Sequence, residues 1–404
     1  MLETWHRHVL CQGNAVEVRG RKVVLGDHTA VVKDGGRMPG VVSLRETSET
    51  QSKPSYFRGH SWGTIGLLTG TLTACFCCPL QLQLHQGWAH RRKKEAAASP
   101  VRVRLAERLV AMAIRWAVTQ QCRCYLVLDA FFSVSSVFRA CRYYSLQDRT
   151  PWVEVLVKAK ANYVGYCPAP PKPAGRRGRP ARYGEKICLR ECFDHPHLFQ
   201  TVTCSVYGRL ETIRVLSLEL LWRPLADRVL FIGAITSRGP LVLMSSDLTL
   251  PAAQAVELYC ARTRIEILFA VLKHLIGAFQ FHFWTHALPK HSRQPVANRQ
   301  LKAPSERGLN SVLACWRAYE TFVLCASIAV GLLQQIALTQ SDTVWAHQQL
   351  YLRTKSRDLP SEKTVRQILQ PLLLDHFFRL DSPGLMAPIR RYLNALEADL
   401  DRGG

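Results

Sequence analysis

The sequence predicts an α/β protein with a mixed β-sheet flanked by helices, a β-rich insertion before a long helix, and a helical C-terminal region. Three observations predict this class. Short β-branched apolar segments alternate with helical periodicity in the first 166 residues, strand-like segments crowd residues 198–245, and helical spacing prevails after Pro251. A chain of 404 residues is long enough for two to three structural units.

The first part of the chain predicts a meander of three strands. Residues 22–32 are apolar and β-branched around the single carboxylate of Asp27, as expected of a buried strand. Two further strand-like segments, 55–70 and 76–86, follow it and are separated by turn-forming threonine and glycine residues.

A helix and a second buried strand come next. Apolar residues recur at near-helical spacing over 101–121, and residues 125–132 form a continuous apolar run interrupted only by Asp129. A helical crossover between two strands places them side by side and parallel. We therefore expect strand 125–132 beside strand 22–32, followed by a helix at 133–146 and a strand at 153–166.

The middle of the chain changes character twice. Residues 167–192 hold five prolines and seven basic residues, which predicts a linker or arm. Residues 198–245 predict a small β-rich insertion, and a long helix is expected over 251–277, directly after a proline. A polar, basic loop at 290–307 precedes a helical remainder.

These elements predict four successive parts of the chain. They are the first part of the core (1–166), the basic linker with the β-rich insertion (167–250), the last part of the core (251–285), and the basic loop with the helical C-terminal region (286–404).

Composition indicates the partner and the compartment. Lys and Arg number 53 against 30 Asp and Glu, a net charge of +23, which favours nucleic acid over a neutral metabolite. No export signal stands in the first thirty residues, so an intracellular, cytoplasmic location with reduced cysteines is expected. The apolar stretch 321–333 is shorter than the roughly 20 residues of a membrane span, which predicts a packed helix and no membrane association.

The helix expected at 251–277 carries a polar stripe on an otherwise apolar surface. Tyr259, Arg262, Glu266 and Lys273 fall within about 60° of one another on an ideal helix. Such a row is also what ordinary ion pairs on a solvated helix face look like.

Two aspartates in apolar strands favour a functional interpretation of that stripe. Asp27 and Asp129 would each be costly to bury without a cation, and together with Glu266 they form a set of three acids. Carboxylate oxygens suit Mg²⁺ or Mn²⁺, and two such ions can activate a hydroxyl and stabilise a leaving oxygen in phosphodiester cleavage.

The spacing Tyr259, Arg262, Glu266, Lys273 resembles the Tyr-Arg-Glu-Lys signature of DDE transposases of the insertion sequence four family. Flanking residues strengthen the resemblance. The stretch 26–29 (Gly-Asp-His-Thr), with 37–40, 52–54 and 59–61, is similar to the region of that family's first aspartate, and 126–130 (Leu-Val-Leu-Asp-Ala) to its second.

This resemblance, over about residues 21–285, implies an RNase H-like core and a cut-and-paste transposase. Two Mg²⁺ or Mn²⁺ ions would be held by Asp27, Asp129 and Glu266, while Tyr259, Arg262 and Lys273 would bind DNA phosphates. The implied partners are transposon ends and target DNA, with a homodimer in the synaptic complex. The implied setting is the bacterial cytoplasm, associated with the nucleoid when bound to DNA.

Two alternatives remain open at the level of sequence. One is an RNase H-like nuclease that only hydrolyses DNA. The other is a truncated, inactive DNA-binding remnant, because such transposases normally carry a helical DNA-binding region before the first acid and only 26 residues precede Asp27 here.

Several weaker motifs have competing interpretations. Arg176, Arg177 and Arg179, around Gly178, resemble a minor-groove hook but also fit a flexible arm that touches phosphates. Trp222 could stack on a flipped base, although a core position is the commoner one. His28 adjoins Asp27, yet a two-metal site needs no histidine as base, so it is left out of the catalytic set. Cys188, Cys192, His195 and His197 could imitate a zinc site, but their spacing does not fit one, so we expect Cys188 and Cys192 to be reduced thiols. We expect the same of the cysteines at 75, 77, 78, 122 and 124.

Overall fold

The computed structural model describes residues 1–45, 56–85, 105–144, 150–160, 162–171, 178–288, 290, 305–348 and 358–379. The chain divides into two compact units, Met1–Gly331 and Leu332–Gly404. The candidate site lies in the first unit.

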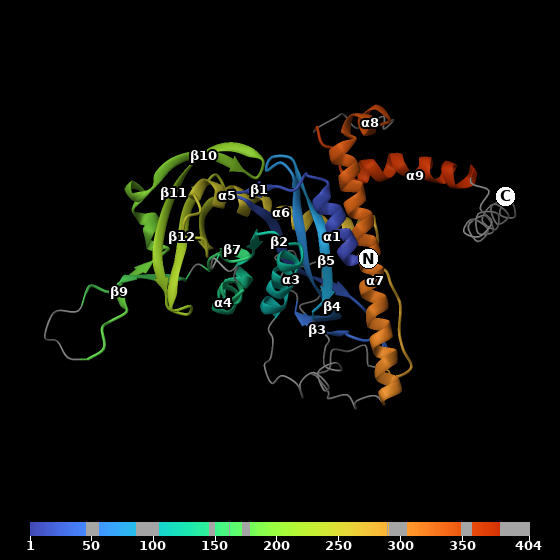
Figure 1. Ribbon diagram of the computed structural model, residues 1–404, viewed down its shortest axis with the longest axis horizontal. Helices are drawn as coiled ribbons and strands as arrows, with labels where there is room; N and C mark the ends of the chain where they lie inside the picture. Colours follow the sequence, from blue (N-terminus) through green and yellow to red (C-terminus); the bar gives the residue numbers. More distant parts are fainter. Residues whose placement is uncertain are drawn as a thin grey trace. The chain divides into compact units, whose positions relative to one another are not determined.

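The centre of the first unit is a mixed sheet (Figure 1). Its strands are β2 (Arg21–Val32), β4 (Tyr56–Gly70), β5 (Cys75–Leu84), β6 (Cys124–Leu128) and β7 (Val153–Lys158), in the spatial order β5-β4-β2-β6-β7. Neighbours among β5, β4 and β2 are antiparallel, whereas β2–β6 and β6–β7 are parallel. The predicted meander and the parallel neighbour are confirmed, and helix α3 (Leu105–Thr119) provides the crossover. The short strands β1 (Glu17–Val18) and β3 (Val42–Arg45) pair with β2 and β4.

The predicted β-rich insertion continues this sheet. Its strands are β10 (Gln200–Val206), β11 (Arg209–Trp222), β12 (Asp227–Thr236) and β13 (Gly239–Ser245), and β13 pairs with β7. Strands β8 (Val164–Pro168) and β9 (Tyr183–Cys188), which precede the predicted insertion, join the same sheet because β8 pairs with β11. Residues 153–166 are therefore two strands, β7 and the start of β8, and the prediction of one strand was wrong. Part of the predicted arm is β9, which pairs with β8 as a ribbon because its tyrosine and isoleucine suit a pleated surface.

Helices cover both faces of the sheet. Alternation along β2 and β6 sends Val24 and Leu126 to one face and Leu25 and Val127 to the other. The first face packs against α1 (Leu2–Cys11), α3 and α4 (Ser135–Tyr143), and the second against α5 (Ala252–Ala261), α6 (Thr263–Ala270) and α7 (Glu306–Thr339). Helix α1 was not foreseen; its Trp5 donates a hydrogen bond to the Pro79 carbonyl oxygen.

The helix predicted over 251–277 is interrupted. Helix α5 ends at Ala261, α6 begins at Thr263, and a π-helical turn spans Val271–Leu275. Arg262 lies at the junction, where its N–H donates to the carbonyl oxygen of Tyr259, three residues back. Arg262 and Glu266 keep the expected spacing of four residues and form an ion pair, whereas Lys273 lies in the π turn that follows α6.

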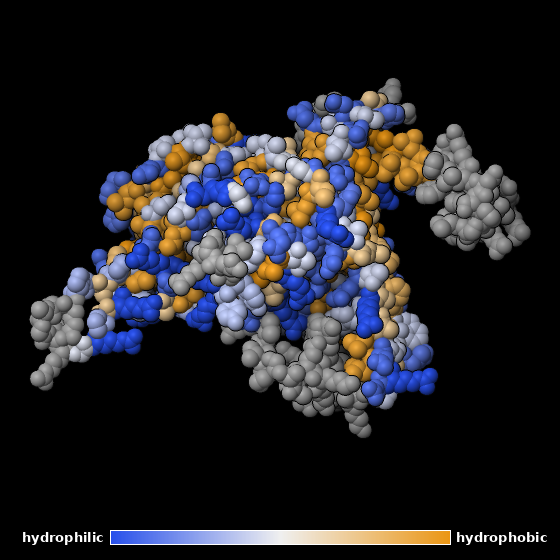
Figure 2. Space-filling model, viewed as in Figure 1, coloured by the Kyte–Doolittle hydropathy of each residue, from blue (hydrophilic) through white to orange (hydrophobic). Residues whose placement is uncertain are grey.

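Helix α7 alone, within the described residues, is long and apolar enough to cross a membrane by length and composition. The predicted packed helix is present, because Val312, Tyr319 and Val323 on one of its faces are buried in the core. The second unit contains the end of α7, α8 (Ser341–Ala346) and α9 (Glu362–Arg379), where Trp345 donates to the Asp358 carbonyl oxygen. Apolar side chains gather on α9 (Figure 2), among them the exposed Leu372–Leu374.

Residues proposed to be core prove to be core. Trp222 is buried and packs edge-on against Phe138, so the base-stacking alternative has no support. Cysteines 75, 77, 78 and 124 are buried free thiols, and Cys122 is partly buried.

Candidate active site

Sheet register brings the two predicted aspartates together. Strands β2 and β6 are parallel neighbours in which Leu25 stands opposite Val127. Asp27 and Asp129 each follow two residues later, so both extend from the face that Leu25 and Val127 occupy. That face packs against α5 and α6, and α6 carries the third acid, Glu266. Strand β6 ends at Leu128, earlier than expected, because the Asp129 carboxylate accepts the Ala130 N–H and starts a short 3₁₀ turn.

All three acids converge on one guanidinium. Arg262 Nη2 lies 2.7 Å from Asp27 Oδ2 and 3.7 Å from Asp129 Oδ2, and Nη1 lies 2.8 Å from Glu266 Oε1. Since Asp27 and Asp129 contact the same nitrogen, their separation cannot exceed these two distances taken together. The structure thus places the three predicted carboxylates at one point of the molecule.

The four side chains of this site differ in their exposure to solvent. The Arg262 side chain is 9% exposed and that of Asp27 19%, whereas Asp129 and Glu266 are 42% and 57% exposed. The acids therefore form a site with an occluded inner end and a solvent-facing outer end. A substrate approaching from solvent would meet Asp129 and Glu266 first.

Burial dominates the electrostatics of Asp27. Loss of solvent raises the pKa of this carboxyl to about 6, against the opposing effects of the Arg262 guanidinium and the His28 N–H. Asp129 and Glu266 raise it further, because like charges disfavour the ionised form. For Arg262, burial works to lower the pKa, but the acids, led by Asp27, more than offset it, so the pKa is raised and the cation persists.

A histidine pair, with His85 buried and His28 partly buried, packs beside Asp27 within β2. His28 Nε2 lies 2.9 Å from His85 Nδ1, and the His28 ring stacks on Phe132. Burial lowers the pKa of His28 to about 4, so the ring is neutral near pH 7. This geometry is that of a packed support and agrees with leaving His28 out of the catalytic set.

Two side chains of the insertion lie near Tyr259 and Arg262 and were not proposed as site residues from the sequence. Tyr207, in the turn between β10 and β11, interacts electrostatically with Tyr259 and Arg262. The Arg238 guanidinium, from the turn between β12 and β13, stacks 3.6 Å from the centre of the Tyr207 ring. A glycine follows each of these residues, as is typical of a turn, but only the fold shows that the Tyr207 turn lies near Arg262.

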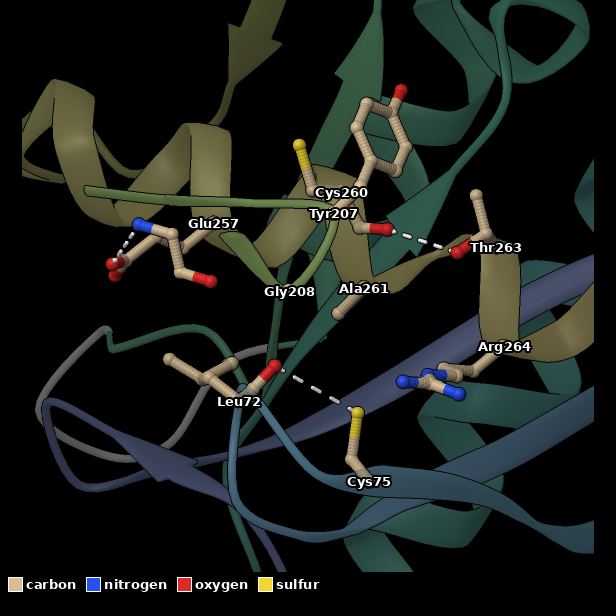
Figure 3. A pocket seen from close by; sticks show the side chains of 10 residues that line it. Leu72, Cys75, Tyr207, Gly208, Glu257, Cys260, Ala261, Thr263 and Arg264 are labelled. Atoms are coloured by element: carbon tan, nitrogen blue, oxygen red, sulfur yellow. Dashed lines mark hydrogen bonds between the residues drawn. The ribbon is translucent and has the colours of Figure 1, made fainter. Parts of the chain in front are cut away.

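A small pocket lies where the insertion meets α5 and α6, the two helices on either side of Arg262 (Figure 3). The Glu257 carboxylate on α5 accepts the Ser205 N–H at 3.0 Å, which holds the end of β10. Arg264 enters the pocket from α6, where its guanidinium contacts the Cys75 thiol. The Tyr207 turn therefore has a defined position relative to Arg262.

Other predicted site residues lie elsewhere or outside the described residues. Lys273 is in the π turn and partly buried, and Arg179 is exposed between β8 and β9. Arg176 and Arg177, with the motif at 52–54, lie outside the described residues. Tyr259 is buried beside the acids, and burial raises its pKa, so its hydroxyl stays protonated.

The donor set suits a hard divalent cation in kind, since three carboxylates converge where a positive charge already sits. Within the described part of the chain, no three His, Cys, Asp or Glu residues are arranged to hold a metal ion. At this site the Arg262 guanidinium lies between the three carboxylates. His195 and His197, with Cys188 and Cys192, form no such group either.

A meander, two parallel strands and three converging acids define an RNase H-like fold with a nuclease-type site. The family of DDE superfamily endonucleases matches residues 6–218 of the chain. The chain belongs to this family, whose members act on DNA and generally use divalent metal ions. The match includes Asp27 and Asp129 and ends before Glu266. No curated protein matches the chain.

Proposed function

We propose that this protein is a DNA transposase that cuts DNA at transposon ends and joins the freed 3′ hydroxyl to target DNA. The observation that carries the proposal is the convergence of Asp27, Asp129 and Glu266 on Arg262. The resemblance of the Tyr259 to Lys273 spacing to the insertion sequence four family supports the finer assignment.

In this proposal Asp27, Asp129 and Glu266 hold two Mg²⁺ or Mn²⁺ ions. Bound divalent ions supply Lewis acidity, which activates a hydroxyl and stabilises a leaving oxygen. The chain itself positions the three acids. The sheet fixes Asp27 and Asp129 in register, the helix junction aims Glu266 at them, and the exposed outer acids face the solvent from which DNA arrives.

DNA binding would rest on groups around the acids. The Tyr259 hydroxyl remains a hydrogen-bond donor, and Lys273 follows on the same segment. Arg238 adds an exposed cation from the insertion, and the net charge of +23 supplies long-range attraction. Arg176, Arg177 and Arg179 would extend contacts along the duplex, and a homodimer would hold two ends together.

The test uses the full chain with Mg²⁺ or Mn²⁺ and labelled DNA that carries the terminal repeats flanking the coding sequence, together with a target plasmid. A transposase gives nicked ends and labelled plasmid with a new strand junction. The Asp129→Asn protein, prepared in the same way, should give neither product.

A nuclease that only hydrolyses DNA is the second candidate, because the family match supports endonuclease chemistry in general and not strand transfer in particular. Nicking by the wild-type protein without any joined product, across a range of DNA ends, would favour this candidate over the transposase.

A further inference from the structure

Arg262 has the geometry of an internal counterion. Its guanidinium donates from both terminal nitrogens, so it contacts Asp27 and Asp129 through Nη2 and Glu266 through Nη1. A guanidinium is planar with five N–H donors, so it can hold several carboxylates in one arrangement. In this structure it lies between the three acids, whereas the family resemblance implies a contact with a DNA phosphate.

This pairing is incomplete in two respects. One positive charge faces three carboxylates, and the buried Nε has no hydrogen-bond partner among the described residues. An unpaired buried donor is costly, and the net negative charge favours a cation of higher charge in the same place. A divalent cation would therefore compete with the guanidinium for the same carboxylates.

The backbone allows the side chain to leave without moving the acids. Arg262 is the link between α5 and α6, Glu266 lies in the first turn of α6, Asp27 is in β2 and Asp129 directly follows β6. The backbone of each acid therefore belongs to an element that does not include Arg262. Rotation of the long arginine side chain toward the exposed end of the site would uncover the carboxylate oxygens.

Resting on the function proposed above, we propose that Arg262 holds the three carboxylates together until a divalent ion binds, and that ion binding displaces its guanidinium toward the DNA backbone. Metal binding and DNA binding are then linked, because the same event completes the metal site and frees a cation for a phosphate. Arg262 acts as a positioning residue first and as a DNA contact afterwards.

The test measures the accessibility of Arg262 directly. The full-length protein is treated with phenylglyoxal, which modifies exposed arginines, in EDTA and in saturating MnCl₂, and adducts are located by peptide mass spectrometry. Occupancy is followed separately by the electron paramagnetic resonance signal of free Mn²⁺. The expected result is an increase of about tenfold or more in Arg262 modification on Mn²⁺ binding.

Two controls make the result specific. Arg264 lies on the same helix beside the Cys75 thiol, so its modification should not change with Mn²⁺. In the Asp129→Asn protein, Mn²⁺ should bind more weakly and the increase at Arg262 should be lost at the same concentration. Arg262→Gln removes the competitor, so its Mn²⁺ dissociation constant should fall by about tenfold.

The outcomes separate this inference from the proposed function. Mn²⁺ binding that depends on Asp129, with Arg262 still protected at saturation, would overturn the displacement and leave the metal site intact. Absence of Mn²⁺ binding by the wild-type protein would contradict both. If Arg262→Gln does not fold, the modification measured on the wild-type protein still decides.

Discussion

Asp27 Oδ2 accepts a hydrogen bond of 2.7 Å from Arg262 Nη2, yet the pKa of Asp27 is raised to about 6. Burial and two neighbouring acids therefore outweigh a direct ion pair. Such a group is kept where function requires it, because it lowers stability near neutral pH.

The first prediction concerns this cost. The folded pKa of Asp27, about 6, lies above its ordinary value of 3.8, so its contribution favours folding at low pH and is lost as the pH rises through 6. At pH 7.5 in EDTA, Asp27→Asn should raise the free energy of unfolding by about 1–3 kcal/mol. Urea unfolding followed by circular dichroism measures this. A less stable variant would show that the pair with Arg262 outweighs burial.

The second prediction concerns the packing of Gly63 against His85, whose ring contacts His28 next to Asp27. A Cβ on Gly63 would lie 2.0 Å from the His85 ring, which in turn contacts His28. Gly63→Ala should therefore lower the free energy of unfolding by about 1–3 kcal/mol through overpacking. Gly233→Ala is the matched strand control, because its Cβ would meet Phe199 at an ordinary 3.4 Å. Equal stability of the two variants would argue against this packing.

The third prediction is a pH dependence far from the acids. Lys33 is buried, donates to the carbonyl oxygens of Phe279 and Phe281, and has its pKa lowered by burial from 10.5 to about 8. Between these values the unfolded chain binds the extra proton, so the Lys33 contribution to stability rises with pH. The stability difference between the wild-type protein and Lys33→Met should therefore shift in favour of the wild type from pH 8 to pH 10. A constant difference would contradict it.

The fourth prediction concerns Arg238, which is exposed and stacks on Tyr207, a neighbour of Arg262. Arg238→Gln should weaken duplex DNA binding and reduce the slope of log affinity against log salt by about 1, with Mn²⁺ affinity unchanged. Fluorescence anisotropy at several salt concentrations measures both quantities. Arg228→Gln is the control, because Arg228 lies at the other end of β12 and pairs with Glu219. An equal loss in both variants would indicate nonspecific attraction only.

Strand periodicity made much of this fold predictable. Asp27 and Asp129 could be paired from sequence because each interrupts an apolar strand, and a helical crossover makes such strands neighbours. The register that aligns the two acids is a property of the sheet, and no local pattern encodes it. The position of α1 likewise depends on contacts with residues more than seventy positions away.

Helical spacing was informative over short distances only. It placed Arg262 on one stripe with Glu266, and the two form an ion pair, whereas the break in the helix and the contacts of Arg262 with Asp27 and Asp129 depend on tertiary structure. The aromatic singled out in the insertion, Trp222, is core, whereas Tyr207 of the same insertion lies near Arg262. Local sequence indicates that a turn exists but not which distant element the turn meets.

The central claim is that Asp27, Asp129 and Glu266 form one divalent-ion site for DNA cleavage. The most direct test is the rate at which the purified full chain nicks supercoiled plasmid in Mn²⁺, compared with Asp129→Asn, whose partly exposed side chain can be changed without disturbing the core. We predict ion-dependent nicking that falls by roughly a hundredfold or more in the variant, with unchanged circular dichroism. Equal nicking rates for the two proteins would contradict the claim.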